Sequence, residues 1–283
     1  MTRPASLLAV FAHPDDEAFS SGGTLAHYAA LGVPVRLVCA TRGEAGKVTN
    51  PALGDAQTLG MHGVGKMREQ ELRDACAALG IEAPIMLNYR DSGRGDRLRI
   101  DDPQALVNAD LNRLESELRA VIRESRPSVM LTFDPHGGYG HPDHLAIHRA
   151  ALGAFLQSGA DLNEDAPQRL FFTAVPLEVI RAQANVTGTP MGGLDPTVYG
   201  VSPSTVAVSM NVRAQAERKR AAIKAHASQT GTTSFLSRYP EGALEAMLIR
   251  ENFSIGGTRG PIPSFPLRGF FDGLPDLAPG SPL

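Results

Sequence analysis

The segment His13–Glu17 (HPDDE) places one histidine and three carboxylates directly after the apolar run 7–11. Carboxylates crowded in this way repel one another unless a cation or a proton lies between them. Histidine and aspartate together are common ligands of zinc and similar divalent metals. Two adjacent acids can also divide the work, one binding the metal and the other acting as a general base. A polar loop with a helix N-cap is the alternative interpretation of this segment.

The segment 137–144 (GGYGHPDH) follows a later apolar run and carries two more histidines. Its proline, Pro142, is typical of the first position of a helix, with His141 as the preceding cap. His141 and His144 then lie one turn apart on the same face of that helix. His148 lies a further turn along, so His144 and His148 form a second pair that could bind a metal. Because the residues between them are mostly apolar, we interpret His148 as an ordinary histidine on a core-bound helix.

The elements that must position these two segments alternate between strand and helix patterns. We expect strands at 7–11, 33–40, 84–89 and 128–133 and helices at 20–31, 66–79, 103–125 and 141–157. Such alternation predicts an α/β fold, a Rossmann-like, mostly parallel sheet with helices on both faces. Ligands bind outside the carboxyl ends of the strands in such sheets. The two segments should therefore converge on one crevice.

The second half of the chain is less regular. Strands are expected at 169–175 and 205–210, a helix at 211–227 and a long loop at 182–204. We predict one domain over 1–283, with a core of about 5–157. The additions of about 169–260 form a smaller C-terminal cap of strands and loops, and the Pro/Gly-rich residues 261–283 form a meandering tail.

Composition narrows the classes of function. Lys plus Arg is 27 and Asp plus Glu is 30, a net charge of −3, which gives no reason to expect nucleic acid as a partner. No run approaches the ~18 apolar residues of a membrane span, and no signal peptide pattern is present. Two widely spaced cysteines fit a reducing compartment, so we expect a cytoplasmic protein. The stretch 60–66 matches G-x-x-x-x-G-K, but Met67 replaces the Ser or Thr that a phosphate-binding loop needs.

The motifs A-H-P-D-D-E at 12–17 and H-P-D-H at 141–144 resemble those of the LmbE-like, or PIG-L, family of zinc-dependent N-acetylglucosaminyl deacetylases. TRGEAG at 41–46, MREQEL at 67–72, RDSG at 90–93 and the K-x-H-x-S-Q segment at 224–229 are also similar to family features. The resemblance spans about residues 5–230. It is closest to the deacetylases of mycothiol- and bacillithiol-type thiol synthesis, which act on GlcNAc-inositol or GlcNAc-malate.

The resemblance implies roles for particular residues. It implies His13, Asp16 and His144 as zinc ligands, although a His-Asp-His set also suits Fe²⁺. Asp15 is implied as the general base, and His141 either stabilises the oxyanion or protonates the leaving amine. The remaining implied residues are Asp143, which orients a histidine; Tyr139, a mobile tyrosine that contacts the oxyanion; and Arg68, Glu44 and Asp91, which lie near the sugar.

The sequence departs from the family pattern after RDSG, where Arg94 replaces a frequent methionine. The expected activity is metal-dependent hydrolysis of the N-acetyl group of a small GlcNAc conjugate, which gives a free amine and acetate. An amidase of a larger thiol S-conjugate is one alternative, and a catalytically silent sugar-binding protein is another. The oligomeric state and the aglycone stay open.

Overall fold

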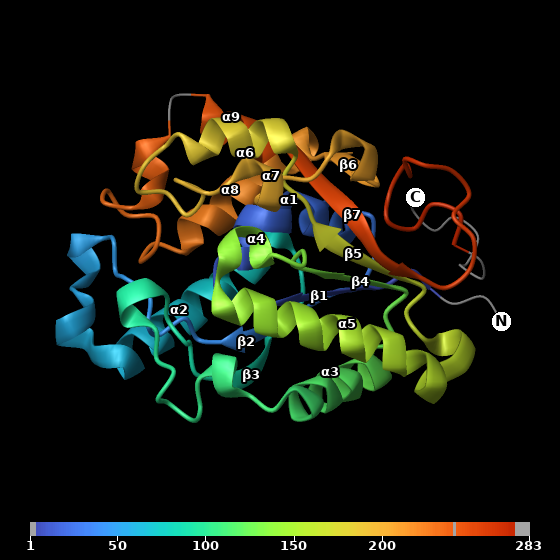
Figure 1. Cartoon of the computed structure of the whole chain (residues 1–283), viewed down its shortest axis with the longest axis horizontal. Helices are drawn as coiled ribbons and strands as arrows, with labels where there is room; N and C mark the ends of the chain where they lie inside the picture. Colours follow the sequence, from blue (N-terminus) through green and yellow to red (C-terminus); the bar gives the residue numbers. More distant parts are fainter. Residues whose placement is uncertain (1–3, 240–241, 275–283) are drawn as a thin grey trace.

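A single seven-stranded sheet runs through the protein (Figure 1), for which a computed structural model describes residues 4–239 and 242–274. The strand order is β3-β2-β1-β4-β5-β7-β6. The strands are β1 (Leu7–Phe11), β2 (Val35–Thr41), β3 (Ile85–Tyr89), β4 (Val129–Thr132), β5 (Arg169–Thr173), β6 (Val208–Asn211) and β7 (Arg250–Thr258). The first five strands pair in parallel, whereas β7 runs antiparallel to both β5 and β6. The predicted Rossmann-like α/β fold is therefore confirmed.

Helices cover both faces of this sheet. The longer helices are α1 (Asp16–Ala30), α2 (Ala56–Leu79), α3 (Leu111–Ser125), α5 (Pro142–Leu162) and α8 (Ala216–Ala225). The α1 helix contacts α2, and α3 and α5 lie side by side on one face of the sheet (Figure 1). The α8 helix packs against α1 and α2. The shorter helices among the described residues are α4 (Gly137–Gly140), α6 (Leu177–Ala184), α7 (Pro196–Tyr199) and α9 (Ala243–Ile249).

The central strands explain why the two motif segments meet. Every residue of β1 is buried, as expected for a parallel strand covered on both faces. In register, Leu7 of β1 lies beside Val35 of β2 on one side and Val129 of β4 on the other. The carboxyl ends of β1 and β4 are thus neighbours. The residues that follow them, from His13 and from Gly137 onward, enter the same crevice.

Two helices begin earlier than the sequence patterns predict. The α1 helix begins at Asp16, not at Ser20, because the acidic residues after β1 form its first turn. The α2 helix begins at Ala56, not at Lys66, and its backbone is broken at Gly60, where φ is 62°. Its three closely spaced glycines weaken the helical pattern in the sequence, since glycine is a poor helix former. The G-x-x-x-x-G-K stretch therefore lies inside a helix, not between a strand and a helix.

Other differences lie outside the motif segments. The α3 helix begins at Leu111, not at Pro103, and the Asp110 side chain caps it by accepting from the Arg113 N–H. The predicted long loop 182–204 contains the end of α6 and the short α7. Strand β7 is a further element that the sequence analysis did not predict. Its Gly256 and Gly257 interrupt the alternation that identifies a strand.

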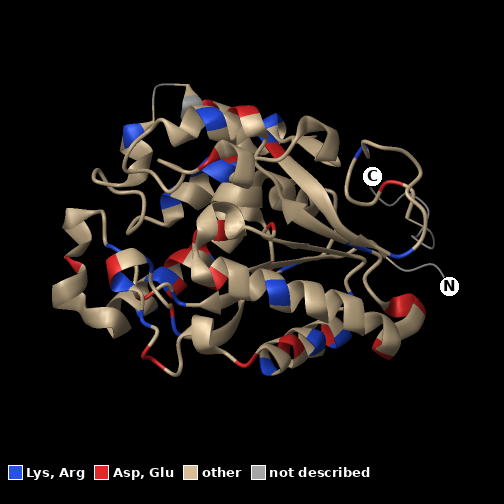
Figure 2. Ribbon diagram, viewed as in Figure 1, with Lys and Arg blue, Asp and Glu red and all other residues tan. Residues whose placement is uncertain are grey.

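The tail packs against the core without forming a helix or strand up to residue 274, and residues 275–283 lie outside the described residues. The Phe270 N–H donates to the Tyr28 hydroxyl at 2.7 Å, and the Phe270 ring stacks on Phe171 at 4.3 Å. Within the described ranges, no helix is long and apolar enough to span a membrane. Both cysteines are buried and free. Figure 2 shows both signs of charge interspersed along α3, where Arg113 pairs with Glu117.

Candidate metal centre and active site

Three side chains from the two motif segments converge at the carboxyl ends of β1 and β4. The His13 Nδ1 and His144 Nε2 atoms are 3.2 Å apart. The Asp16 carboxylate lies 3.4 Å from His13 Nδ1 through Oδ2 and 3.3 Å from His144 Nε2 through Oδ1. A tetrahedral zinc ion with bonds near 2.0–2.1 Å holds its ligand atoms roughly 3.3–3.4 Å apart. The spacing of these three side chains is therefore in the range that such an ion requires.

Hydrogen bonds behind both rings determine which nitrogen faces the cluster. His13 Nε2 lies 3.0 Å from Asp143 Oδ2, which also accepts the Ser92 N–H at 2.9 Å. His144 Nδ1 lies 3.0 Å from the Gly137 carbonyl. These acceptors hold the ring protons on the outer nitrogens, so His13 Nδ1 and His144 Nε2 present lone pairs. With both rings neutral, two lone pairs face the Asp16 carboxylate, which accepts the His13 backbone N–H at 2.7 Å. None of the three side chains then donates to another, and a cation would satisfy this arrangement.

The electrostatics of the cluster favour positive charge. Burial lowers the pKa of His13, but surrounding carboxylates, above all Asp91, outweigh it and raise that pKa well above its ordinary value. Burial by itself raises the pKa of Asp16. The opposing effect of His144 and His13 is larger, so the pKa lies well below its ordinary value. A divalent cation can take the place of the proton that these carboxylates otherwise hold on the imidazole.

Two further groups of possible metal ligands among the described residues overlap with the set of His13, Asp16 and His144. One comprises His13, His141 and His144, and the other comprises His13, Asp91 and Asp143. The second group lies on the outer side of the His13 ring, where Asp143 already accepts from His13 and Ser92. The predicted alternative ligand His148 faces elsewhere, because its Nδ1 lies 2.8 Å from the Phe133 carbonyl. The inner face, with Asp16, is the better candidate for a metal.

Asp15 adopts an unusual backbone conformation beside the cluster. Its φ of 106° and ψ of −27° lie in the left-handed region that residues with side chains rarely adopt. Strain of this kind costs about 1–3 kcal/mol and persists only where surrounding contacts enforce it. Arg68 Nη2 lies 3.2 Å from Asp15 Oδ2 and also donates to the Pro14 carbonyl. Burial raises the pKa of Asp15 to about 6, against the opposing effect of Arg68.

His141 and Tyr139 border the cluster on the side of β4. The Asp143 N–H donates to His141 Nδ1 at 3.2 Å, so a neutral His141 carries its proton on Nε2. Burial and two neighbouring histidines lower the pKa of His141 to about 2 and keep the ring neutral. The Tyr139 ring lies 5.0 Å from the His144 ring and stands between Gly138 and Gly140, both with positive φ. Arg94 lies over the Tyr139 ring at 4.7 Å.

The three residues predicted near the sugar occupy different environments. Arg68 is buried and donates to the Gly43 carbonyl, and a Cβ at Gly43 would lie 2.3 Å from the guanidinium. The Asp91 carboxylate accepts the N–H groups of Ala45 and Gly93 and lies 3.5 Å from His13 Nε2. Glu44 is half-buried, and its buried Oε2 has no hydrogen-bond partner. Of the three, Glu44 is the one whose carboxylate has an oxygen without a hydrogen-bond partner.

Some parts of the site carry no signal in the sequence. The Gly137 carbonyl that orients His144 is a backbone atom, and the Phe133 ring that stacks on His144 at 3.9 Å belongs to an ordinary apolar run. The sequence analysis also gave no role to Glu17. The sequence feature that could have pointed to Glu17 is its position next to Asp16 in an acidic cluster.

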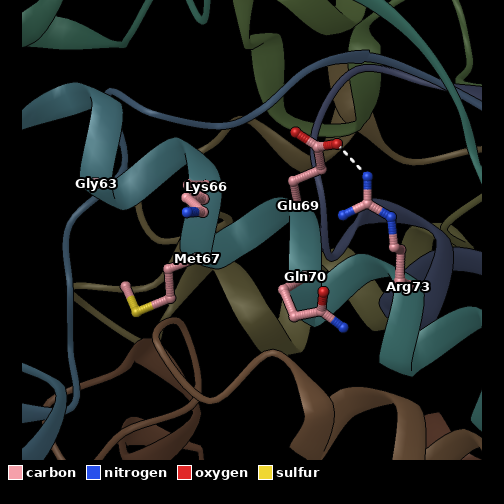
Figure 3. Close-up of a pocket in the computed structure, with 6 residues that line it drawn as sticks. All are labelled: Gly63, Lys66, Met67, Glu69, Gln70 and Arg73. Atoms are coloured by element: carbon pink, nitrogen blue, oxygen red, sulfur yellow. Dashed lines mark hydrogen bonds and ion pairs between the residues drawn. The ribbon is translucent and has the colours of Figure 1, made fainter.

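A cavity of about 600 Å³ lies along α2 (Figure 3). The residues that line it are Gly63, Lys66, Met67, Glu69, Gln70 and Arg73. Glu69 pairs with Arg73 within the cavity and with Arg42 outside it. None of the predicted site residues lines this cavity, and the Glu69 carboxylate in it already pairs with two arginines. The cavity is therefore separate from the cluster at the strand ends.

The fold and the site describe an α/β enzyme with a candidate His/Asp metal centre, and comparison with known proteins identifies its family. The sequence model of PIG-L, described as GlcNAc-PI de-N-acetylase, matches residues 8–155. This match covers more than half of the chain, which therefore belongs to the PIG-L family of N-deacetylases.

Two curated relatives bear the description 1D-myo-inositol 2-acetamido-2-deoxy-alpha-D-glucopyranoside deacetylase. The protein from Salinispora arenicola is 38% identical over 241 residues, which cover 81% of this chain and 78% of the relative. The protein from Thermobifida fusca is 36% identical over 270 residues, which cover 91% of this chain and 94% of the relative. Similarity to these relatives thus extends well beyond the region that the family model matches.

Solved structures share the fold at lower sequence identity. N,N'-diacetylchitobiose deacetylase from Pyrococcus horikoshii is 19% identical with a TM-score of 0.57, covering 88% of this chain and 83% of its own. A teicoplanin deacetylase in a zinc-inhibited form is 18% identical with a TM-score of 0.55, covering 89% and 97%. A 4-carboxy-2-hydroxymuconate hydratase from Pseudomonas putida is 19% identical with a TM-score of 0.62, covering 91% and 98%. Because a hydratase shares the fold, the reaction must be argued from the site.

Proposed function

We propose that this protein is a zinc-dependent hydrolase that removes the N-acetyl group from a GlcNAc-inositol conjugate. The observation that carries the proposal is the convergence of His13 Nδ1, His144 Nε2 and the Asp16 carboxylate beside Asp15. A binding protein needs no general base beside a metal site. The substrate class rests on the descriptions of the two relatives at 36–38% identity.

His13, Asp16 and His144 would hold the zinc ion, and three protein ligands leave a position open for water and substrate. Zinc in such a site lowers the pKa of its water to about 7 and polarises the amide carbonyl. Asp143 keeps the His13 ring in the orientation and tautomer that ligation requires, through the 3.0 Å contact at Nε2. Of the two histidines nearby, His13 and not His141 is the one that the Asp143 side chain orients.

Asp15 acts as the general base that takes the proton of the attacking water. Arg68 lies 3.2 Å from Oδ2 and restrains the carboxylate, which leaves Oδ1 to accept that proton. A pKa near 6 suits this task, because the carboxylate is ionised at neutral pH and still basic enough to accept a proton. The protonated Asp15 can then deliver the proton to the departing amine.

His141 stabilises the negative charge that develops on the carbonyl oxygen. Its Nδ1 accepts the Asp143 N–H, so Nε2 carries the proton and donates to that oxygen. Tyr139 is a second donor, because its ring stands beside His144 at the edge of the cluster. The Glu44 carboxylate accepts from a sugar hydroxyl, and Arg68 and Asp91 shape the wall around the sugar.

The direct test measures acetate release by the zinc-loaded protein from five compounds. These are free GlcNAc, GlcNAc-inositol, GlcNAc-malate, diacetylchitobiose and a thiol S-conjugate with a larger amide. We expect kcat/KM to be highest for GlcNAc-inositol. Cleavage of the S-conjugate alone would instead establish an amidase. Retention of a GlcNAc glycoside without acetate release, with zinc bound, would establish a sugar-binding protein. We also propose that the protein is located in the cytoplasm.

A further inference from the structure

A buried ion pair lies behind the strained residue Asp15. His226 Nε2 is 2.7 Å from Glu17 Oε1, and both side chains are fully buried. The other oxygen of Glu17, Oε2, accepts the backbone N–H of Asp15 at 3.1 Å. Glu17 thus connects His226, far along the chain, to the backbone of Asp15, whose φ of 106° needs such support.

His226 is itself held firmly in place. It follows α8, and its carbonyl accepts the N–H groups of Gln229 and Thr230 at 2.9 and 3.0 Å. The next turn is attached to α2, because both the N–H and the hydroxyl of Ser228 donate to Glu71 at 2.7 Å. The imidazole therefore meets Glu17 from a rigid segment. That segment lies outside residues 8–155, the part matched by the family model.

We infer that Glu17 and His226 are positioning residues that hold Asp15 in the strained backbone conformation from which it acts as the general base. The inference rests on the proposed function, because it needs Asp15 to be that base. Arg68 restrains the Asp15 side chain from one side, while Glu17 restrains the Asp15 backbone from the other. Neither Glu17 nor His226 needs to touch the substrate. A misplacement of the base by about 1 Å is enough to cost on the order of 10²-fold in rate.

A purely structural role for the pair is the rival explanation, and a set of substitutions separates the two. Removing one partner of a buried pair leaves the other charge unpaired, whereas replacing both by apolar groups can restore stability. We therefore compare Glu17→Met, His226→Leu and the double variant. Each single variant should lose stability. The double variant should regain much of it, yet its methionine cannot accept the Asp15 N–H.

The measurements are kcat, KM, zinc content and urea unfolding for every variant. We expect kcat of the double variant to stay about 10²-fold below wild type, with KM and one zinc per chain unchanged. Recovery of kcat together with stability would show a structural role only and overturn the inference. Loss of zinc from the double variant would also overturn it, because the pair would then organise the metal ligands.

Glu17→Gln supplies the conservative rescue. Its amide oxygen can still accept the Asp15 N–H, and its NH₂ can donate to His226 Nε2 once the imidazole proton moves to Nδ1. The proton can move to Nδ1 without breaking a hydrogen bond, because His226 Nδ1 has no hydrogen-bond partner. We expect kcat within about tenfold of wild type, whereas Glu17→Met stays near the full loss. Equal losses in the two variants would contradict the positioning role. Absence of acetate release by the wild type would instead refute the proposed function, before any variant is compared.

Discussion

Two clusters of buried charge in this protein differ in how their hydrogen bonds are satisfied. At Lys219 and Glu251, donors match acceptors: Glu251 accepts the N–H groups of Gly23 and Thr24, and Lys219 donates to Glu251 at 2.8 Å. At the strand ends, lone pairs from two neutral histidines face the Asp16 carboxylate, and its one donor there is the His13 backbone N–H, not a side chain of the cluster. The first cluster is complete within the chain and stabilises the fold. The second is a candidate site for a cation that would complete it.

The largest expected effect follows from removing one of those lone pairs. His144→Ala should bind less than stoichiometric zinc and release acetate only at background rate, because two ligands cannot hold the ion tightly. Metal analysis after dialysis, together with the acetate assay, checks this. His148→Asn is the matched control, since its amide can still reach the Phe133 carbonyl and His148 lies outside the cluster. Stoichiometric zinc in His144→Ala would contradict the ligand assignment.

Asp15→Asn should separate metal binding from chemistry. The amide cannot accept the water proton, so we expect kcat to fall by about 10²–10⁴-fold while one zinc per chain remains. Zinc content and steady-state kinetics measured on the same preparation provide the check. Full activity in this variant would refute the assignment of Asp15 as the base.

His141 gives a smaller effect. His141→Ala removes one donor to the developing oxyanion, so kcat should fall by about 10²–10³-fold. His141→Gln places an amide NH₂ near the position of Nε2 and should recover part of that loss. Steady-state kinetics of both variants decide between the two roles open for this residue. If the glutamine variant is as slow as the alanine variant, His141 transfers a proton instead of only donating a hydrogen bond.

Lys219→Met tests the cluster that is complete within the chain. It leaves Glu251 buried without its cation, so the free energy of unfolding should fall by about 3–5 kcal/mol. Zinc content and kcat should hardly change, because neither side chain of the pair belongs to the candidate metal centre. Arg220→Gln on the same helix breaks exposed pairs with Glu245 and Glu217 and should cost at most about 1 kcal/mol. Urea unfolding of both variants makes the comparison. Equal losses of stability would remove the distinction between the two pairs.

The fold and the convergence of the two motif segments were predictable from the sequence. Apolar runs such as 7–11 and 128–133, separated by helical patterns, predict a parallel sheet. The rule that ligands bind at the carboxyl ends of strands then brings His13 and His144 together. These inferences succeed because they use periodicity and chain order, which do not depend on exact side-chain positions.

Other features depend on three-dimensional contacts that periodicity does not encode. Strand β7 completes the sheet although Gly256 and Gly257 interrupt its pattern, because it pairs with both β5 and β6. The contact between Glu17 and His226 joins residues far apart in sequence, and the strained φ of Asp15 depends on such contacts. Likewise, the sequence suggests that Asp143 orients a histidine, but only the structure shows that it contacts His13.

The most direct test of the account is a zinc titration of the metal-free protein with GlcNAc-inositol as substrate. Acetate release should rise in proportion to added zinc and reach a plateau at one equivalent per chain. Asp15→Asn should bind the same single equivalent and stay near background. Full acetate release by the metal-free protein, or a plateau only at two or more equivalents, would contradict a single zinc site formed by His13, Asp16 and His144.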